Sequence, residues 1–160
     1  MFIIEIPNGR KWEEVVNMFF GNYSHSLDEK GRLVIPRKMR DELGVKIFIM
    51  KGFDGALAMY KSDAFSAVVE EQQKYSFLKK ENRDYLRLKL ASIVELEVDK
   101  MGRVQIPTAI LNKYSISKDV IVLGAGDHIE VWDKTKYDEY ISSIEDDYEG
   151  IAERIGNDNE

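Results

Sequence analysis

Five cations lie within eleven residues in the first quarter of the chain, at a spacing that suits contact with a polyanion. They are Lys30, Arg32, Arg37, Lys38 and Arg40. Arginine offers a planar fork of donors to guanine edges or phosphates, and lysine offers a point charge to phosphate. The pattern alone leaves two interpretations open. One is a nucleic-acid surface, and the other is a solvated helix face in which Asp41 and Glu42 are the ionic partners.

The stretch that carries these cations has a second copy in the same chain. Residues 28–44 read D-E-K-G-R-L-V-I-P-R-K-M-R-D-E-L-G, and the pattern returns 71 residues later as D-K-M-G-R-V-Q-I-P-T-A-I-L-N-K-Y. The residues expected to order the two turns are Asp28, Gly31, Asp99 and Gly102. An aspartate accepts hydrogen bonds from the amides that follow it, and glycine supplies the positive φ of a tight turn. One folding unit has therefore been used twice.

The second copy keeps few of the cations. Lys100 and Arg103 remain in its turn, but Leu111 stands where the first copy has Arg40. We therefore expect the first copy to dominate any contact with DNA. The second copy is expected mainly to complete the fold, with Leu111 in a packing role.

Patterns that would indicate catalysis are weak. His25 and His128 are the two histidines, they do not occupy matching positions of the repeat, and neither lies in a metal-ligand motif. Asp28 and Asp99 can in principle form an acid–base pair across a twofold axis. The other interpretation is that each aspartate orders its own turn, or pairs with the arginine four residues on. We therefore expect that the protein is not an enzyme and has no cofactor or metal site. The alternative is a small enzyme whose site lies at the Asp28/Asp99 axis.

Short strands are expected to position the turns. The expected strands are residues 19–27, 32–35, 46–50 and 56–60 in the first copy, and residues 93–98, 120–123 and 129–132 in the second. The first two should form a hairpin around the first turn. One residue is gained before the third strand of the second copy, so that Gly52 matches Gly124 at an offset of 72.

Helices are expected at the other positions. One should begin after each I-P dipeptide, where the missing N–H of proline costs nothing. Ser62 suits the N-cap of a further helix. The pattern of residues 80–90 predicts a helix with Leu90 directed inward and Lys89 on its basic side. A long amphipathic helix is expected after Trp132.

Composition limits the class of protein. The 160 residues are 44% hydrophobic and 32% charged, which is typical of a folded chain. The absence of cysteine excludes disulfides and zinc–thiolate sites and indicates a reducing cytoplasm. Residues 133–160 hold ten acidic and three basic residues, whereas the remaining 132 hold 19 acidic and 20 basic. The net charge of −6 is therefore a property of the tail and does not argue against nucleic acid.

The twin D-x-x-G-R-x-x-I-P motifs resemble the SpoVT/AbrB domain. Two such domains in one chain, opening with M-F-F-G-N-Y-S-H-S-L-D-E-K-G-R and closing with G-A-G-D-H-I-E-V-W-D-K, resemble the MraZ family of bacterial transcriptional regulators. The resemblance covers about residues 18–140. Residues 1–17 fall outside it and are either a real extra segment or an over-long start.

The resemblance implies an α+β fold. In that fold, tandem, swapped-hairpin-like SpoVT/AbrB repeats form one pseudo-twofold, β-barrel-like core with peripheral helices. The expected organisation is an N-terminal extension (1–17), repeat 1 (22–64), a helical connector (65–92), repeat 2 (93–136) and an acidic C-terminal helix and tail (137–160).

The resemblance also implies a function. It implies sequence-specific binding of double-stranded DNA upstream of the protein's own gene, in the division and cell-wall gene cluster, usually with repression. The binding form would be a ring-shaped homo-oligomer on repeated operator boxes. The protein would be cytoplasmic and nucleoid-associated, with no membrane partner and no small-molecule substrate. The alternative is an antitoxin-like module whose acidic C-terminal segment binds a protein partner.

The expected DNA-binding residues are Lys30, Arg32, Arg37, Lys38, Arg40, Lys100 and Arg103. The DNA-contacting arginines of single-domain relatives fall on Arg32 and Arg40. A third falls on His25, where this chain departs from the pattern, and a neutral histidine attracts phosphate less strongly than arginine does.

Overall fold

The computed structural model describes residues 18–158, so the expectation for residues 1–17 lies outside the described part of the chain. The first copy comprises β1 (Asn22–Ser26), β2 (Arg32–Val34), α2 (Arg37–Leu43), β3 (Lys46–Lys51) and β4 (Leu57–Lys61). The second comprises β5 (Val94–Glu97), β6 (Arg103–Gln105), α5 (Thr108–Lys113), β7 (Asp119–Gly124) and β8 (Ile129–Asp133). Between them lie α3 (Ser62–Gln72) and α4 (Lys80–Ala91), and α6 (Lys134–Ile144), a 3₁₀ turn (Glu145–Asp147) and α7 (Tyr148–Asp158) follow.

The strands of the two copies are interleaved. Six strands form one antiparallel sheet in the order β1-β7-β8-β4-β3-β5, and β2 pairs with β6 in a separate two-stranded ribbon. The expected hairpin between the first two strands is therefore wrong, because β1 pairs with β7 and β2 with β6. The swapped-hairpin expectation is confirmed, since both strands beside each D-x-x-G turn find their partners in the other copy.

A pseudo-twofold axis relates the copies. In the ribbon, Leu33 lies opposite Val104, its own counterpart 71 residues away, and in the sheet Ala58 lies opposite Glu130. The expected match of Gly52 with Gly124 is wrong by one residue. Gly52 donates to the Ala56 carbonyl (3.1 Å) and Ala125 donates to the His128 carbonyl (2.9 Å), so Ala125 is the structural counterpart of Gly52. The turn between β7 and β8 is one residue shorter than its equivalent.

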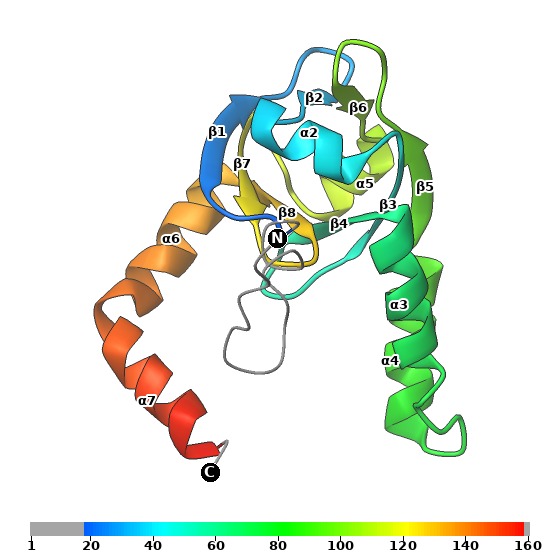
Figure 1. Cartoon of the computed structure of the whole chain (residues 1–160), viewed down its shortest axis with the longest axis vertical. Helices are drawn as coiled ribbons and strands as arrows, with labels where there is room; N and C mark the ends of the chain where they lie inside the picture. The colour runs from blue at the N-terminus through cyan, green and yellow to red at the C-terminus, as the bar shows by residue number, and fades with distance from the viewer. Residues whose placement is uncertain (1–17, 159–160) are drawn as a thin grey trace, which may run out of the picture.

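The core lies between the sheet and the ribbon (Figure 1). Alternation along the short ribbon strands directs Leu33 and Val104 inward, where both are fully buried together with Ile35 and Ile106. Strands β3, β4, β7 and β8 supply the opposite wall. The sheet is open, with β1 and β5 as its edges within residues 18–158, so the barrel-like core is a curved sheet covered by the ribbon and by α2 and α5.

The helices between the copies differ from expectation in two details. Helix α3 begins at Ser62, but its N-cap is Lys61 and no side chain caps it, because the Ser62 hydroxyl donates to the Lys46 carbonyl (3.1 Å). In α4 the side chain of Lys89 is buried and Leu90 is exposed, the reverse of the prediction. The Lys89 ammonium donates to the Lys51 carbonyl (3.0 Å), so tertiary contacts decide which side faces inward.

Two helical arms leave the sheet on opposite sides (Figure 1). Helices α3 and α4 form an antiparallel hairpin on one side, and α6 followed by α7 forms the C-terminal arm on the other. The expected single long helix after Trp132 is interrupted at residues 145–147, where three consecutive acidic residues form a 3₁₀ turn. No helix among residues 18–158 is long and apolar enough to cross a membrane.

Asp133 attaches the C-terminal arm to the sheet. Its carboxylate caps α6 by accepting from the Lys136 amide (3.3 Å), and it also accepts from the amide (3.0 Å) and the hydroxyl (2.6 Å) of Ser117. Burial raises the pKa of Asp133, but the hydrogen bonds from Ser117 and Lys136 outweigh it, so the net pKa lies below the usual value. The carboxylate is thus stabilised in the folded state.

Replacing Asp133 should therefore reduce stability in a pH-dependent way. We expect Asp133→Ala to lower the free energy of unfolding by about 1–2 kcal/mol at neutral pH, as for other N-caps. A lowered folded-state pKa gives stability that is present above the unfolded pKa of 3.8 and is lost as the pH falls through the folded value. The measurement is urea unfolding of the wild type and of Asp133→Asn, which removes the titrating carboxylate, from neutral pH to about pH 3. The free energy of unfolding should fall less in the variant than in the wild type over this range. An equal loss would contradict this assignment.

Candidate nucleic-acid interface

The outer face of the β2–β6 ribbon presents four side chains to solvent. Because Leu33 and Val104 point inward, the alternate positions Arg32, Val34, Arg103 and Gln105 point outward. Arg32 lies opposite Gln105, and Val34 lies opposite Arg103. The two arginines therefore sit diagonally on one surface, related by the pseudo-twofold axis. The sequence reasoning did not identify Val34 and Gln105, although the period of two around buried Leu33 indicates them.

Each arginine of the ribbon is positioned by the aspartate of its own turn. The Asp28 carboxylate accepts from the amides of Lys30 and Arg32 (2.9 Å each) and from Arg32 Nε. Asp99 repeats this with the amides of Met101 and Arg103 (2.9 Å each) and with Arg103 Nε (2.9 Å). Gly31 and Gly102 complete the turns with the expected positive φ, 76° in both.

These contacts bear on the proposed acid–base pair. The Arg32 amide is the main cause that lowers the pKa of Asp28, and the Arg103 amide does the same for Asp99. Two carboxylates sharing a proton would have one raised pKa, whereas both are lowered here. Each aspartate orders its turn and holds its arginine, as the simpler interpretation predicted.

The arginine forks keep donors available for a ligand. In both ion pairs the aspartate engages Nε, and within residues 18–158 no hydrogen bond engages the Nη atoms of Arg32 or Arg103. Both side chains are about one-quarter exposed, at 28% and 24%. The aspartate therefore fixes the direction of each guanidinium and leaves its terminal N–H groups without a partner among residues 18–158. Such pre-organised forks suit guanine edges and phosphate oxygens.

The two turns are fastened to each other across the axis. The Ile35 amide donates to the Gly102 carbonyl (2.9 Å), and the Ile106 amide donates to the Gly31 carbonyl (3.0 Å). The Gln105 side-chain amide adds a bond to the Lys30 carbonyl (3.2 Å). The four outward side chains consequently share one rigid support.

Arg40 is more involved in the fold than the sequence suggested. Its Nε donates to the Ile35 carbonyl (2.8 Å), and its guanidinium lies so close to Gly102 that a Cβ there would overlap it. Leu111, its counterpart, lies against Gly31, where a Cβ would be 3.2 Å from Leu111 Cδ1. Each helix therefore covers the turn glycine of the other copy. Leu111 is buried as expected.

The remaining expected cations lie in the two turns and at the start of α2, and all of them are exposed. They are Lys30, Arg37, Lys38 and Lys100. None of them forms an ion pair within the described residues. Glu42, a suggested partner on the helix face, instead pairs with Lys61. The exposed charges near β2 are thus not neutralised by their own helix.

His25 lies on the edge strand β1. Burial and then the positive charge of Arg40 lower its pKa, so the ring is neutral at pH 7. This agrees with the expectation of weak phosphate attraction at this position. No group of three histidine, aspartate or glutamate side chains in the described part of the chain is arranged to hold a metal ion.

Two interleaved hairpin units in one chain, sharing a ribbon that carries one oriented arginine from each, define a tandem protein of the SpoVT/AbrB fold class. A family model described as "MraZ protein, putative antitoxin-like" matches residues 18–88 and again residues 90–158. The chain belongs to the MraZ family.

Individual relatives agree with this assignment. A protein named transcriptional regulator MraZ from Caldanaerobacter subterraneus subsp. tengcongensis is 40% identical over 140 residues, which cover 88% of this chain and 98% of the relative. Proteins of the same name from Mesoplasma florum and Moorella thermoacetica are 41% and 33% identical over 139 and 138 residues, covering 86% of this chain and 95% and 96% of theirs.

Proposed function

We propose that this chain is a transcriptional regulator that binds double-stranded DNA through the outer face of the β2–β6 ribbon. The observation that carries the proposal is the pair of arginines that Asp28 and Asp99 hold through Nε, whose Nη donors have no hydrogen-bond partner among residues 18–158. Relatives of nearly full length that carry the name transcriptional regulator support it. The proposed role is binding, without catalysis or cofactor.

The ribbon matches the major groove in shape and chemistry. A two-stranded ribbon fits that groove, and an arginine fork pairs with the O6 and N7 acceptors of guanine. In the proposed complex Arg32 and Arg103 reach base edges. The exposed cations Lys30, Arg37, Lys38 and Lys100 contact phosphates and set the register of the protein on the duplex.

One chain offers few cations, so a single ribbon binds weakly. Its contacts are largely ionic, so the affinity falls as the salt concentration rises, and more steeply the more contacts are made. We propose that a ring of several copies presents the ribbon repeatedly to equally spaced operator boxes. Effective concentration then converts weak contacts into tight binding. The proposed target lies upstream of the chain's own gene. Binding there represses transcription of the division and cell-wall gene cluster. The protein would act in the cytoplasm, at the nucleoid.

The test is fluorescence anisotropy with labelled DNA from upstream of the chain's own gene. We expect tight binding at about 50 mM salt, a loss of at least about tenfold at about 200 mM, and much weaker binding to a fragment with a single box. Equal affinity for a scrambled duplex at both salt concentrations would overturn sequence-specific regulation.

Arg40 allows the structural and DNA-binding roles of one residue to be separated. We expect Arg40→Leu to keep the free energy of unfolding within about 1 kcal/mol of wild type, because Leu111 already fills the equivalent position. The same change should weaken operator binding about three- to tenfold, since a cation is lost beside the ribbon. Urea unfolding and anisotropy measure the two effects. A large loss of stability with unchanged DNA affinity would show that Arg40 serves only the fold.

The antitoxin-like description of the matching family favours a second candidate. In this candidate the chain is a regulator that binds a protein partner through its acidic C-terminal arm. Residues 145–158 hold six acidic residues and one basic residue, and α7 has no buried residue. Co-purification of a toxin-like protein that is lost on removal of α7 would support this candidate.

A further inference from the structure

The outer face of the β2–β6 ribbon is not symmetric, although its backbone is. Of its four outward side chains, Gln105 alone is polar and uncharged. Gln105 is exposed and lies opposite Arg32, whereas its counterpart across the pseudo-twofold axis is Val34, opposite Arg103. The ribbon therefore has two unlike halves. One half pairs an arginine with an amide, and the other pairs an arginine with an apolar side chain.

Gln105 is held by a turn, as the two arginines are. Its Nε2 donates one hydrogen to the Lys30 carbonyl (3.2 Å). A glutamine side chain has two N–H donors and one carbonyl oxygen. Within the described part of the chain the second N–H and Oε1 have no hydrogen-bond partner. The contact with the turn thus restrains the amide and leaves one donor and one acceptor for a ligand.

One donor beside one acceptor is the complement of adenine in the major groove. Adenine presents the acceptor N7 next to the donor N6–H₂, and the amide of glutamine pairs with both. Guanine presents two acceptors, cytosine a donor, and thymine an acceptor and a methyl group, so none of them satisfies both groups of the amide. A contact of this kind discriminates against the wrong base by about 5- to 150-fold.

The register places Gln105 close to Arg32. The Ile106 amide donates to the Gly31 carbonyl, so the next pair of the antiparallel ladder, Arg32 with Gln105, is a non-hydrogen-bonded pair. Side chains of such a pair are closely spaced, with Cβ atoms roughly 4.5–5.5 Å apart. Successive bases of one DNA strand are about 3.4 Å apart along the axis. The two side chains therefore suit neighbouring bases.

We propose that Gln105 reads an adenine next to the guanine that Arg32 reads. The two arginines alone would recognise the duplex equally in either direction, because the pseudo-twofold axis exchanges them. Gln105 removes this ambiguity, since Val34 in the other half offers no hydrogen bond to a base. The bound chain consequently has one direction on its operator. The inference rests on the proposed DNA-binding function and names the base preference of that site.

The test is the affinity of the full chain for every single base-pair variant of a one-box operator fragment, measured by fluorescence anisotropy at about 50 mM salt. For the wild type we expect one A·T pair whose replacement weakens binding about 5- to 150-fold. Gln105→Leu should bind all variants at that pair equally and keep its preference for guanine. Gln105→Glu has only acceptors and should prefer cytosine at that pair.

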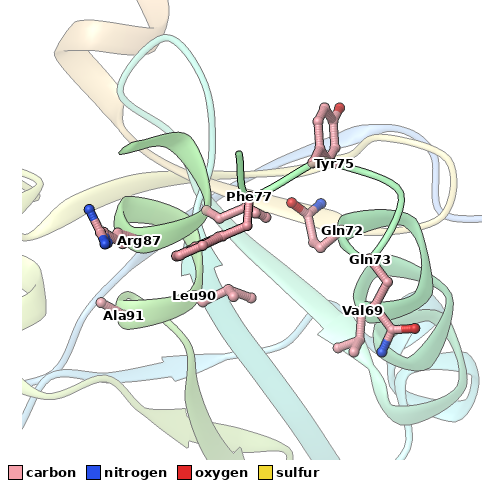
Figure 2. A pocket seen from close by; sticks show the side chains of 9 residues that line it. Val69, Gln72, Gln73, Tyr75, Phe77, Arg87, Leu90 and Ala91 are labelled. Atoms are coloured by element: carbon pink, nitrogen blue, oxygen red, sulfur yellow. The ribbon is translucent and has the colours of Figure 1, made fainter. Parts of the chain in front are cut away.

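Two further variants sharpen the comparison. Val34→Gln places a second amide at the equivalent position of the other half, and should add a second adenine preference related to the first by the twofold axis. Gln73→Ala is the matched control. Gln73 is an exposed glutamine at the end of α3, on the wall of the groove between α3 and α4 and away from the ribbon (Figures 1 and 2). Its base preferences should equal those of the wild type.

A purely structural role for Gln105, through its bond to the Lys30 carbonyl, predicts a different result. Gln105→Leu would then weaken binding to every fragment by the same factor, and that outcome would overturn the proposal. So would an A·T preference that survives in Gln105→Leu while circular dichroism shows the variant folded. Sequence-specific binding with an unchanged Gln105→Leu profile would refute only this inference. A wild type without any sequence preference would refute the regulator, and this inference with it.

Discussion

Changing Arg32 to alanine should abolish detectable operator binding, with an expected loss of at least about 100-fold in affinity. The substitution removes the unpaired Nη donors of Arg32 and leaves the Asp28 carboxylate without its ionic partner at the proposed DNA surface. In the proposed ring each copy would lose the same contact, so the effect would be multiplied across the proposed operator boxes. Anisotropy with the upstream DNA measures it, and circular dichroism checks that the turn remains folded.

Arg103→Ala is the matched control, because the pseudo-twofold axis gives Arg103 the same support. We expect a smaller loss, about tenfold. The expected difference comes from the residue two positions before each arginine. That residue is Lys30 before Arg32, and the exposed, uncharged Met101 before Arg103. Equal losses for the two variants would refute the dominance of the first copy.

Leu33→Ala should produce the largest loss of stability among single changes in the ribbon. Leu33 is fully buried opposite Val104 at the pseudo-twofold axis, where both copies contribute to one cluster. A buried leucine truncated to alanine typically costs about 2–5 kcal/mol, a large share of the total of about 5–15 kcal/mol. Urea unfolding should show the midpoint falling in one cooperative transition.

Val34→Ala provides the control one residue further along the same strand. Its side chain points outward and is 36% exposed, so we expect a change within about 0.5 kcal/mol. A comparable loss for both variants would contradict the assignment of inner and outer faces on β2.

The sequence was most informative where a residue type has one physical use. Gly31 and Gly102 were expected to take positive φ, and they do, because few other residues adopt it without strain. The repeat predicted the swapped fold through the family resemblance. Local pattern predicted a hairpin instead, because an Asp–Gly turn has the same chemistry whether the flanking strands pair with each other or with strands of another repeat.

Tertiary contacts decided the details that local pattern missed. Lys89 is buried because its ammonium finds the Lys51 carbonyl and lies 5.5 Å from the centre of the Phe53 ring. Arg40 turns toward Gly102 because that glycine leaves room for a guanidinium. Neither partner is near in sequence, so helical periodicity cannot reveal it.

The interleaved strands also affect how a newly made chain folds. Strand β1 finds its partner β7 roughly a hundred residues further along, as in the pairing of Asn22 with Leu123. Contacts over such separations pay the entropy of loop closure first and form slowly. On the ribosome the first repeat therefore emerges with unpaired strand edges and stays exposed to aggregation until the second has been synthesised. Maturation of this protein should accordingly depend on chaperones or on rapid translation of its second half.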